Sequence, residues 1–105
     1  MKTTIAIFAV LALAGCATAE AQRANGPSKV ISSTTAPDLI RDCMISVSPS
    51  TISATPFKGG WMIASSYNPN IATWMEVTPS PKGSDVIVYG QRGFRIVAER
   101  CSPSA

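Results

Sequence analysis

The chain has 105 residues, with nine Lys and Arg against six Asp and Glu, a formal net charge of +3 and no histidine. This positive charge is weak and scattered along the sequence, so it does not indicate a basic surface that binds nucleic acid. The lack of histidine removes the commonest general base, the Ser–His and Cys–His nucleophile pairs and most zinc sites. No glycine-rich phosphate loop or serine nucleophile elbow replaces them. We therefore predict a protein that is not an enzyme and that uses no cofactor or metal.

Residues 1–16 begin with a basic residue, continue with an uncharged apolar run and end in small residues before a cysteine. The run is shorter than the roughly 20 residues that a membrane-spanning helix needs, and the order is typical of a secretory signal. Leu-Ala-Gly-Cys at residues 13–16 resembles the lipobox of bacterial lipoproteins. The resemblance covers residues 1–16. It implies removal of residues 1–15, diacylglycerol and palmitate on Cys16, and a lasting membrane anchor.

Ala17 follows the cysteine that the resemblance marks for lipidation. In the Gram-negative pattern of that family, an aspartate at this position favours retention at the inner membrane. Alanine therefore implies the outer membrane, with the protein facing the periplasm.

Residues 16–36 have few large apolar side chains and no sustained period, and they include an Asn-Gly-Pro turn and a Ser/Thr run. This composition predicts a flexible, lipidated tether ahead of a folded domain over residues 37–105. The alternative is that Val30 and Ile31 dock as a short edge strand.

The folded domain is expected to open with a helix over residues 37–47. Proline and aspartate stand at its first two positions, which suits a helix start. Its apolar residues share one helical face: Leu39, Ile40, Cys43, Met44 and Val47. The Ser/Thr/Pro-rich residues 48–59 are expected to form a loop.

The period then changes to two, which predicts strands over residues 60–67 and 71–78 around an Asn-Pro-Asn turn. Placing the ends of the turn opposite each other pairs Trp61 with Val77, Ile63 with Met75 and Ser65 with Thr73. A break over residues 79–83 precedes a third, β-branched strand over 84–89.

Residues 94–101 fit two structures. As a helix, they align Phe94, Val97, Ala98 and Cys101 on one face; as a fourth strand, they alternate apolar and polar residues. We prefer the helix. The predicted fold is then a small two-layer α+β domain, in which an N-terminal and a C-terminal helix cover one face of a three-stranded antiparallel sheet. The alternative is one helix on a four-stranded meander.

Cys43 and Cys101 remain as a pair once Cys16 is assigned to the lipid. An exported chain folds in an oxidising compartment, where two such thiols usually form a disulfide. The rival interpretation, metal binding, lacks ligands because the chain has no histidine. We predict a disulfide between Cys43 and Cys101, joining the two helices.

Strand alternation places one apolar set away from the helices: Met62, Trp74, Ile87 and Tyr89. These residues are expected to form a partner-binding patch bordered by Glu76 and Asp85, because exposed apolar patches with aromatic residues often mark interfaces. The alternative is that the tether, the 48–59 loop or a second copy covers this face.

The sequence therefore predicts a lipid-anchored protein of the bacterial cell envelope, acting as a non-catalytic interaction module that binds a protein or itself. One alternative is an exclusion lipoprotein derived from a phage or plasmid. Another is an inhibitor of a cell-wall hydrolase, for which residues 79–83 are the candidate loop.

Overall fold

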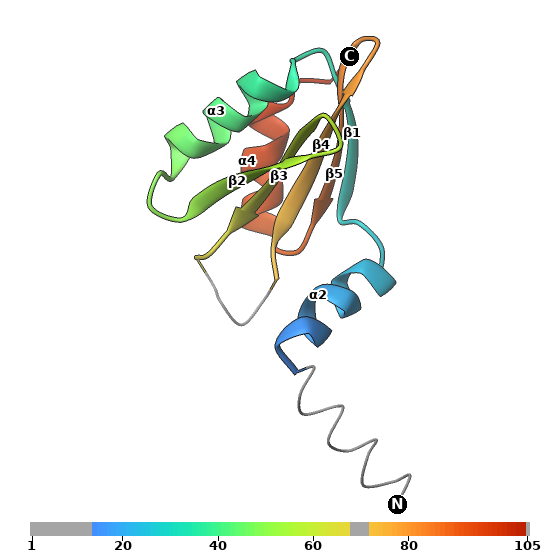
Figure 1. The fold of residues 1–105 in the computed structure, drawn as a ribbon, viewed down its shortest axis with the longest axis vertical. Helices are drawn as coiled ribbons and strands as arrows, with labels where there is room; N and C mark the ends of the chain where they lie inside the picture. The colour runs from blue at the N-terminus through green and yellow to red at the C-terminus, as the bar shows by residue number, and fades with distance from the viewer. Residues whose placement is uncertain (1–13, 68–71, 105) are drawn as a thin grey trace, which may run out of the picture.

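The computed structural model describes residues 14–67 and 72–104, which form one sheet with two helices on one face and a third helix beyond one end of the sheet (Figure 1). The elements are α2 (Ala14–Ala24), β1 (Lys29–Ser33), α3 (Pro37–Val47), β2 (Ile52–Phe57), β3 (Gly60–Ser65), β4 (Trp74–Ser80), β5 (Gly83–Tyr89) and α4 (Arg92–Cys101). The sheet is antiparallel throughout, in the order β1-β5-β4-β3-β2. Helices α3 and α4 pack together on one face.

The prediction of a three-stranded sheet is wrong, because the sheet has five strands. The alternative of a four-stranded meander is closer, since β2 to β5 follow one another as neighbours in the sheet. That alternative gave the domain one packed helix, however, whereas α3 and α4 both contribute buried side chains to the core. The two strands outside the preferred prediction, β1 and β2, form the two edges of the sheet.

Strand β1 lies inside the segment that was expected to be a flexible tether. It pairs with β5 from Lys29 opposite Val88 to Ser33 opposite Ser84, so the sheet begins at residue 29 rather than after residue 36. The alternative that Val30 and Ile31 dock as an edge strand is therefore the correct one. Burial of Ile31 against the core explains the pairing, since this side chain would otherwise remain in water.

Strand β2 replaces part of the loop expected over residues 48–59. It is joined to β3 by a two-residue turn at Lys58 and Gly59, whose φ angles are 48° and 82°. Two successive positive φ angles define the type I′ turn, whose twist matches that of the flanking strands. The Lys-Gly pair in the sequence is thus the signal of a hairpin.

The two helices of the domain agree with the sequence. Helix α3 runs from Pro37 to Val47, with proline in its first turn, and buries Ile40 and Met44. Residues 92–101 form helix α4, which confirms the helical interpretation of this segment and not the fourth strand. The disulfide is also confirmed: Cys43 of α3 is bonded to Cys101 of α4, with Cα atoms 5.7 Å apart.

The register of the central hairpin is as predicted. Trp61 lies opposite Val77 and Ile63 opposite Met75, and the Ser65 amide donates a 3.0 Å hydrogen bond to the Thr73 carbonyl. The turn expected at residues 68–70 lies outside the described residues.

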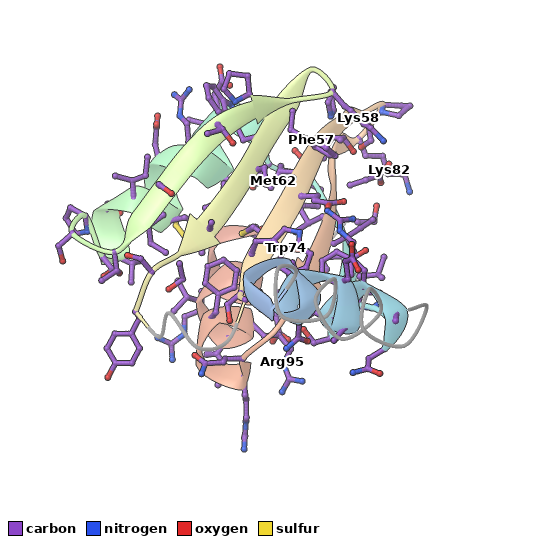
Figure 2. The ribbon with its side chains drawn as sticks, turned by 60° about the horizontal axis from the view of Figure 1, so that its bottom comes forward. Phe57, Lys58, Met62, Trp74, Lys82 and Arg95 are labelled. Atoms are coloured by element: carbon purple, nitrogen blue, oxygen red, sulfur yellow. A yellow bond between two sulfur atoms is a disulfide. The ribbon has the colours of Figure 1, made fainter. Side chains whose placement is uncertain are left out.

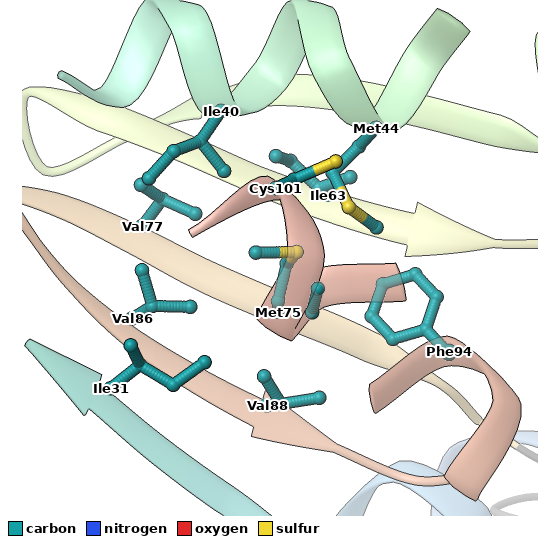
Figure 3. Packing of buried hydrophobic residues seen from close by; sticks show 11 residues of the cluster. Ile31, Ile40, Met44, Ile63, Met75, Val77, Val86, Val88, Phe94 and Cys101 are labelled. Atoms are coloured by element: carbon teal, nitrogen blue, oxygen red, sulfur yellow. The ribbon is translucent and has the colours of Figure 1, made fainter. Parts of the chain in front are cut away.

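Inward-facing strand residues meet the two helices in one core between the layers (Figure 3). Its buried members are Ile31, Ile40, Met44, Ile63, Met75, Val77, Val86, Val88, Phe94, Ala98 and Cys101. The opposite face of the sheet is not covered by α3 or α4, so its residues are the ones to inspect for function.

Candidate functional site

The outer face, defined here as the face of the sheet turned away from α3 and α4, carries two neighbouring rows of side chains. The strand registers place Thr55, Met62, Glu76, Ile87 and Val30 in one row across the sheet. They place Ala64, Trp74 and Tyr89 in the next. The four residues of the predicted patch therefore do lie together, on the face expected from the strand alternation.

The patch differs from the prediction in its exposure and in its charge. Met62, Ile87 and Tyr89 are half-buried, but Trp74 is only 5% exposed and is not a free anchor in this conformation. Glu76 does not border the patch, because the register sets it between Met62 and Ile87. Asp85 is exposed at its edge, as expected.

Trp74 is buried by one neighbour from the sheet and one from outside it. Its ring stacks on that of Tyr89, with centroids 4.5 Å apart and planes 13° apart. Arg23 of α2 lies beside both rings, with its Cζ atom 5.1 Å from the Trp74 ring centroid and 5.6 Å from that of Tyr89. Figure 2 shows α2 near the labelled Trp74, whereas the labelled Met62 lies farther along the sheet from that helix.

Glu76 completes this cluster with a negative charge. Its Oε2 atom accepts a 3.1 Å hydrogen bond from Trp74 Nε1 and forms a 2.9 Å ion pair with Arg23 Nη2. Glu76 is 8% exposed, and a carboxylate so far removed from water is costly unless it is paired and hydrogen-bonded. Both conditions are met here. The cluster of Arg23, Trp74, Glu76 and Tyr89 is the candidate site.

Sequence reasoning did not find Arg23, because it treated residues 16–36 as a tether. Arg23 lies in the last turn of α2, where a cation interacts favourably with the helix dipole. An isolated basic residue in an alanine-rich segment does not reveal its partner in the sequence. The contact depends on β4 and β5 bringing Glu76, Trp74 and Tyr89 together.

The second tryptophan has similar neighbours on the helix-covered side of the sheet. Trp61 Nε1 donates a 2.8 Å hydrogen bond to Asp38 Oδ1, and the Cζ atom of Arg41 lies 4.4 Å from the Trp61 ring centroid. The hydrogen bond from Arg41 to Asp42 raises the pKa of Arg41 above its usual value. All three partners belong to α3, so this cluster fixes the helix to β3 rather than forming a second site.

A cavity of about 230 Å³ opens between the end of α3, the start of α4 and the neighbouring ends of β2 and β3. Its lining is mostly apolar: Met44, Val47, Ile52, Phe94 and Val97, with Ser48, Thr51, Ser65, Tyr67, Gln91 and Gly93. No charged side chain lines it, so its described walls offer shape and apolar surface but no ion pair.

Within residues 14–67 and 72–104, no cluster of three or more His, Cys, Asp or Glu side chains is arranged to hold a metal ion. No helix among these residues is long and apolar enough to cross a membrane. Cys16 lies in α2, but its side chain and the rest of the predicted signal through Leu13 lie outside what the structure describes.

Comparison with known proteins gives no match: no family model, no curated protein and no solved structure matches the chain.

Proposed function

We propose that this chain is a lipid-anchored interaction module of the bacterial cell envelope, held in the outer membrane through Cys16 and facing the periplasm. Its partner surface is the outer face of the sheet. One observation carries the proposal: α3 and α4 cover the same face, and the half-buried Met62 and Ile87 lie on the other.

The chemistry of the outer face suits binding rather than reaction. Met62 and Ile87 offer apolar surface on either side of Glu76, and Tyr89 offers an aromatic ring beside them. Apolar and aromatic surface around a desolvated charge is typical of the centre of a protein interface. The ligand is a protein surface, either of another protein or of a second copy of this chain.

The path of α2 supports an anchor close to this surface. Cys16 precedes Arg23 by about two helical turns, which corresponds to roughly 10 Å along the helix axis. With Arg23 bound to the sheet, a lipid on Cys16 would hold the outer face near the membrane rather than at the end of a long tether.

Site-specific photocrosslinking in intact cells tests the proposal. The residue p-benzoylphenylalanine replaces Met62 or Ile87 on the outer face and, as a matched control, Leu39, which is 61% exposed on α3. We expect discrete adducts, either with another protein or with a second copy of the chain, from positions 62 and 87 but not from position 39.

Crosslinking from position 39 shows which result would contradict the proposal. Adducts of equal yield from all three positions would show collision rather than recognition. Their absence from positions 62 and 87, with a folded and processed chain, would exclude the outer face as the partner surface.

A further inference from the structure

The outer face contains three groups that together form a binding site for a cation. Trp74 and Tyr89 present two stacked rings, and Glu76 presents a carboxylate oxygen at their edge. Aromatic faces attract cations, and a desolvated carboxylate strengthens that attraction. In this structure the cation is the guanidinium of Arg23, which contacts both rings and Glu76.

Arg23 is better placed than a lysine would be to satisfy all three groups. Its Nη2 atom pairs with Glu76 Oε2 at 2.9 Å while its Cζ atom stays within 5.6 Å of both ring centroids. A planar guanidinium donates in its plane and stacks with its face, whereas an ammonium is a compact point charge without a face. The site therefore matches guanidinium chemistry.

Arg23, which occupies this site, lies on a segment that can move away from the sheet. The Arg23 side chain remains 49% exposed, while that of Glu76 is 11% exposed, so the acceptor is built into the sheet and the donor is not. After α2, Gly26 has a φ angle of 86° and nothing within 4 Å of the position that a Cβ would take. Glycine has the widest range of backbone angles of any residue, so Gly26 is the position in this link where α2 can turn relative to β1.

We propose that Trp74, Tyr89 and Glu76 form an arginine-binding site that Arg23 occupies in cis and that an arginine of a partner protein occupies in trans. The partner's arginine displaces Arg23 and frees α2 from the sheet, while the rest of the partner contacts the adjoining apolar surface of Met62 and Ile87. This inference rests on the proposed partner surface and names the side chain that the partner uses there.

Fluorescence titration of the purified full chain tests the site. The chain has two tryptophans, so Trp61→Phe leaves Trp74 as the reporter. The ligand is N-acetyl-L-arginine amide, which carries a guanidinium as its one charge. In the Arg23→Ala variant we expect a saturable change in Trp74 emission. Half-saturation should fall at a concentration at least about tenfold lower than in the chain that retains Arg23, because the tethered side chain competes at high effective concentration.

Three controls accompany the titration, two of them variants and one a ligand. Arg41→Ala removes the guanidinium beside the other tryptophan, and it should leave the Trp74 titration unchanged because Arg41 lies on the helix-covered side. N-acetyl-citrulline amide has nearly the same shape as the arginine ligand without the charge, and it should not bind. Adding Glu76→Gln to Arg23→Ala should abolish arginine binding while leaving the fold, monitored by circular dichroism, intact.

Three results would overturn the inference: no saturable change in folded Arg23→Ala, equal binding of the citrulline ligand, or equal binding of N-acetyl-lysine amide. Each would leave Arg23 as a structural clamp. Because the crosslinking from positions 62 and 87 needs no arginine ligand, its success beside a failed titration would retain the partner surface and reject the arginine site alone.

Discussion

Trp74 and Tyr89 are direct cross-strand partners on β4 and β5, and their rings stack with centroids 4.5 Å apart. Such pairs stabilise a sheet beyond the area that they bury. The pair has a further consequence, because Arg23 lies beside both rings and so attaches α2 to the sheet. The outer face is thus a structured part of the fold, although the two packed helices lie on the other side.

The first prediction concerns the relative cost of losing each tryptophan. Trp74→Ala should lower the free energy of unfolding by about 3 kcal/mol, because it removes a nearly buried ring and leaves Glu76 with one hydrogen bond fewer. Trp61 is half-buried, so Trp61→Ala should cost about half as much. Urea denaturation of the two variants beside the parent measures both values.

The sequence alone suggests the opposite order, with Trp61 in the core and Trp74 as an exposed anchor. Strand alternation placed both residues on the correct faces, but it contains no information on how far each face is covered. A loss below about 0.5 kcal/mol for Trp74→Ala, the range usual for exposed sites, would contradict the packing of α2 and Tyr89 on this ring.

The elements with strong periodicity were predictable, and the edges of the sheet were not. Helices α3 and α4, the hairpin register and the disulfide follow from apolar spacing, because those segments bury one face each. Strands β1 and β2 are short, rich in Ser and Thr, and in β2 interrupted by Pro56. Edge strands receive much of their stability from backbone pairing with a neighbour, which composition does not encode.

The second prediction measures the link between α2 and the sheet. Arg23→Ala, Glu76→Gln and the double variant form a double-mutant cycle, in which glutamine still accepts the hydrogen bond from Trp74. We expect a coupling energy of about 1 kcal/mol, since the Arg23 end of the pair is half-exposed and screened by water. Coupling that does not differ from zero in low salt would show that the ion pair does not form in solution.

The third prediction compares two glycines. A Cβ atom at Gly60 would overlap the backbone carbonyl of Val77, on the neighbouring strand of the sheet. Gly60→Ala should therefore destabilise the protein by more than about 4 kcal/mol, or prevent folding. Gly93, in the first turn of α4, has nothing within 4 Å of the same position, and Gly93→Ala should be neutral or stabilising by about 0.5 kcal/mol. Thermal melting of both variants is the measurement, and equal losses would contradict the close approach of β3 and β4.

The fourth prediction concerns the disulfide, which closes a loop between residues 58 positions apart. On the loop-entropy model, a cross-link that closes so long a loop raises the free energy of the unfolded chain by about 4 kcal/mol. This is a large share of the free energy of unfolding of a small domain. Cys43→Ser and Cys101→Ser should each produce a loss of this order, and the double variant should lose no more than either. In the parent, both thiols should resist alkylation until a reductant is added; free thiols in protein isolated from cells without a reductant would refute the bond.

The last prediction tests the anchor. If the proposed anchor exists, Cys16→Ser should yield an unprocessed precursor that incorporates no labelled palmitate, because in the lipoprotein family that residues 1–16 resemble the thiol accepts the diacylglycerol and cleavage follows its modification. Cys43→Ser is the matched control: it also removes one thiol, from a residue bonded within the fold, and should be processed and labelled like the parent. Since Cys16 lies in α2 and Arg23 holds that helix to the sheet, Arg23→Ala should change neither cleavage nor labelling while releasing the outer face. Normal cleavage and labelling of Cys16→Ser would refute the proposed lipidation at Cys16. It would also refute the placement of the outer face beside the membrane.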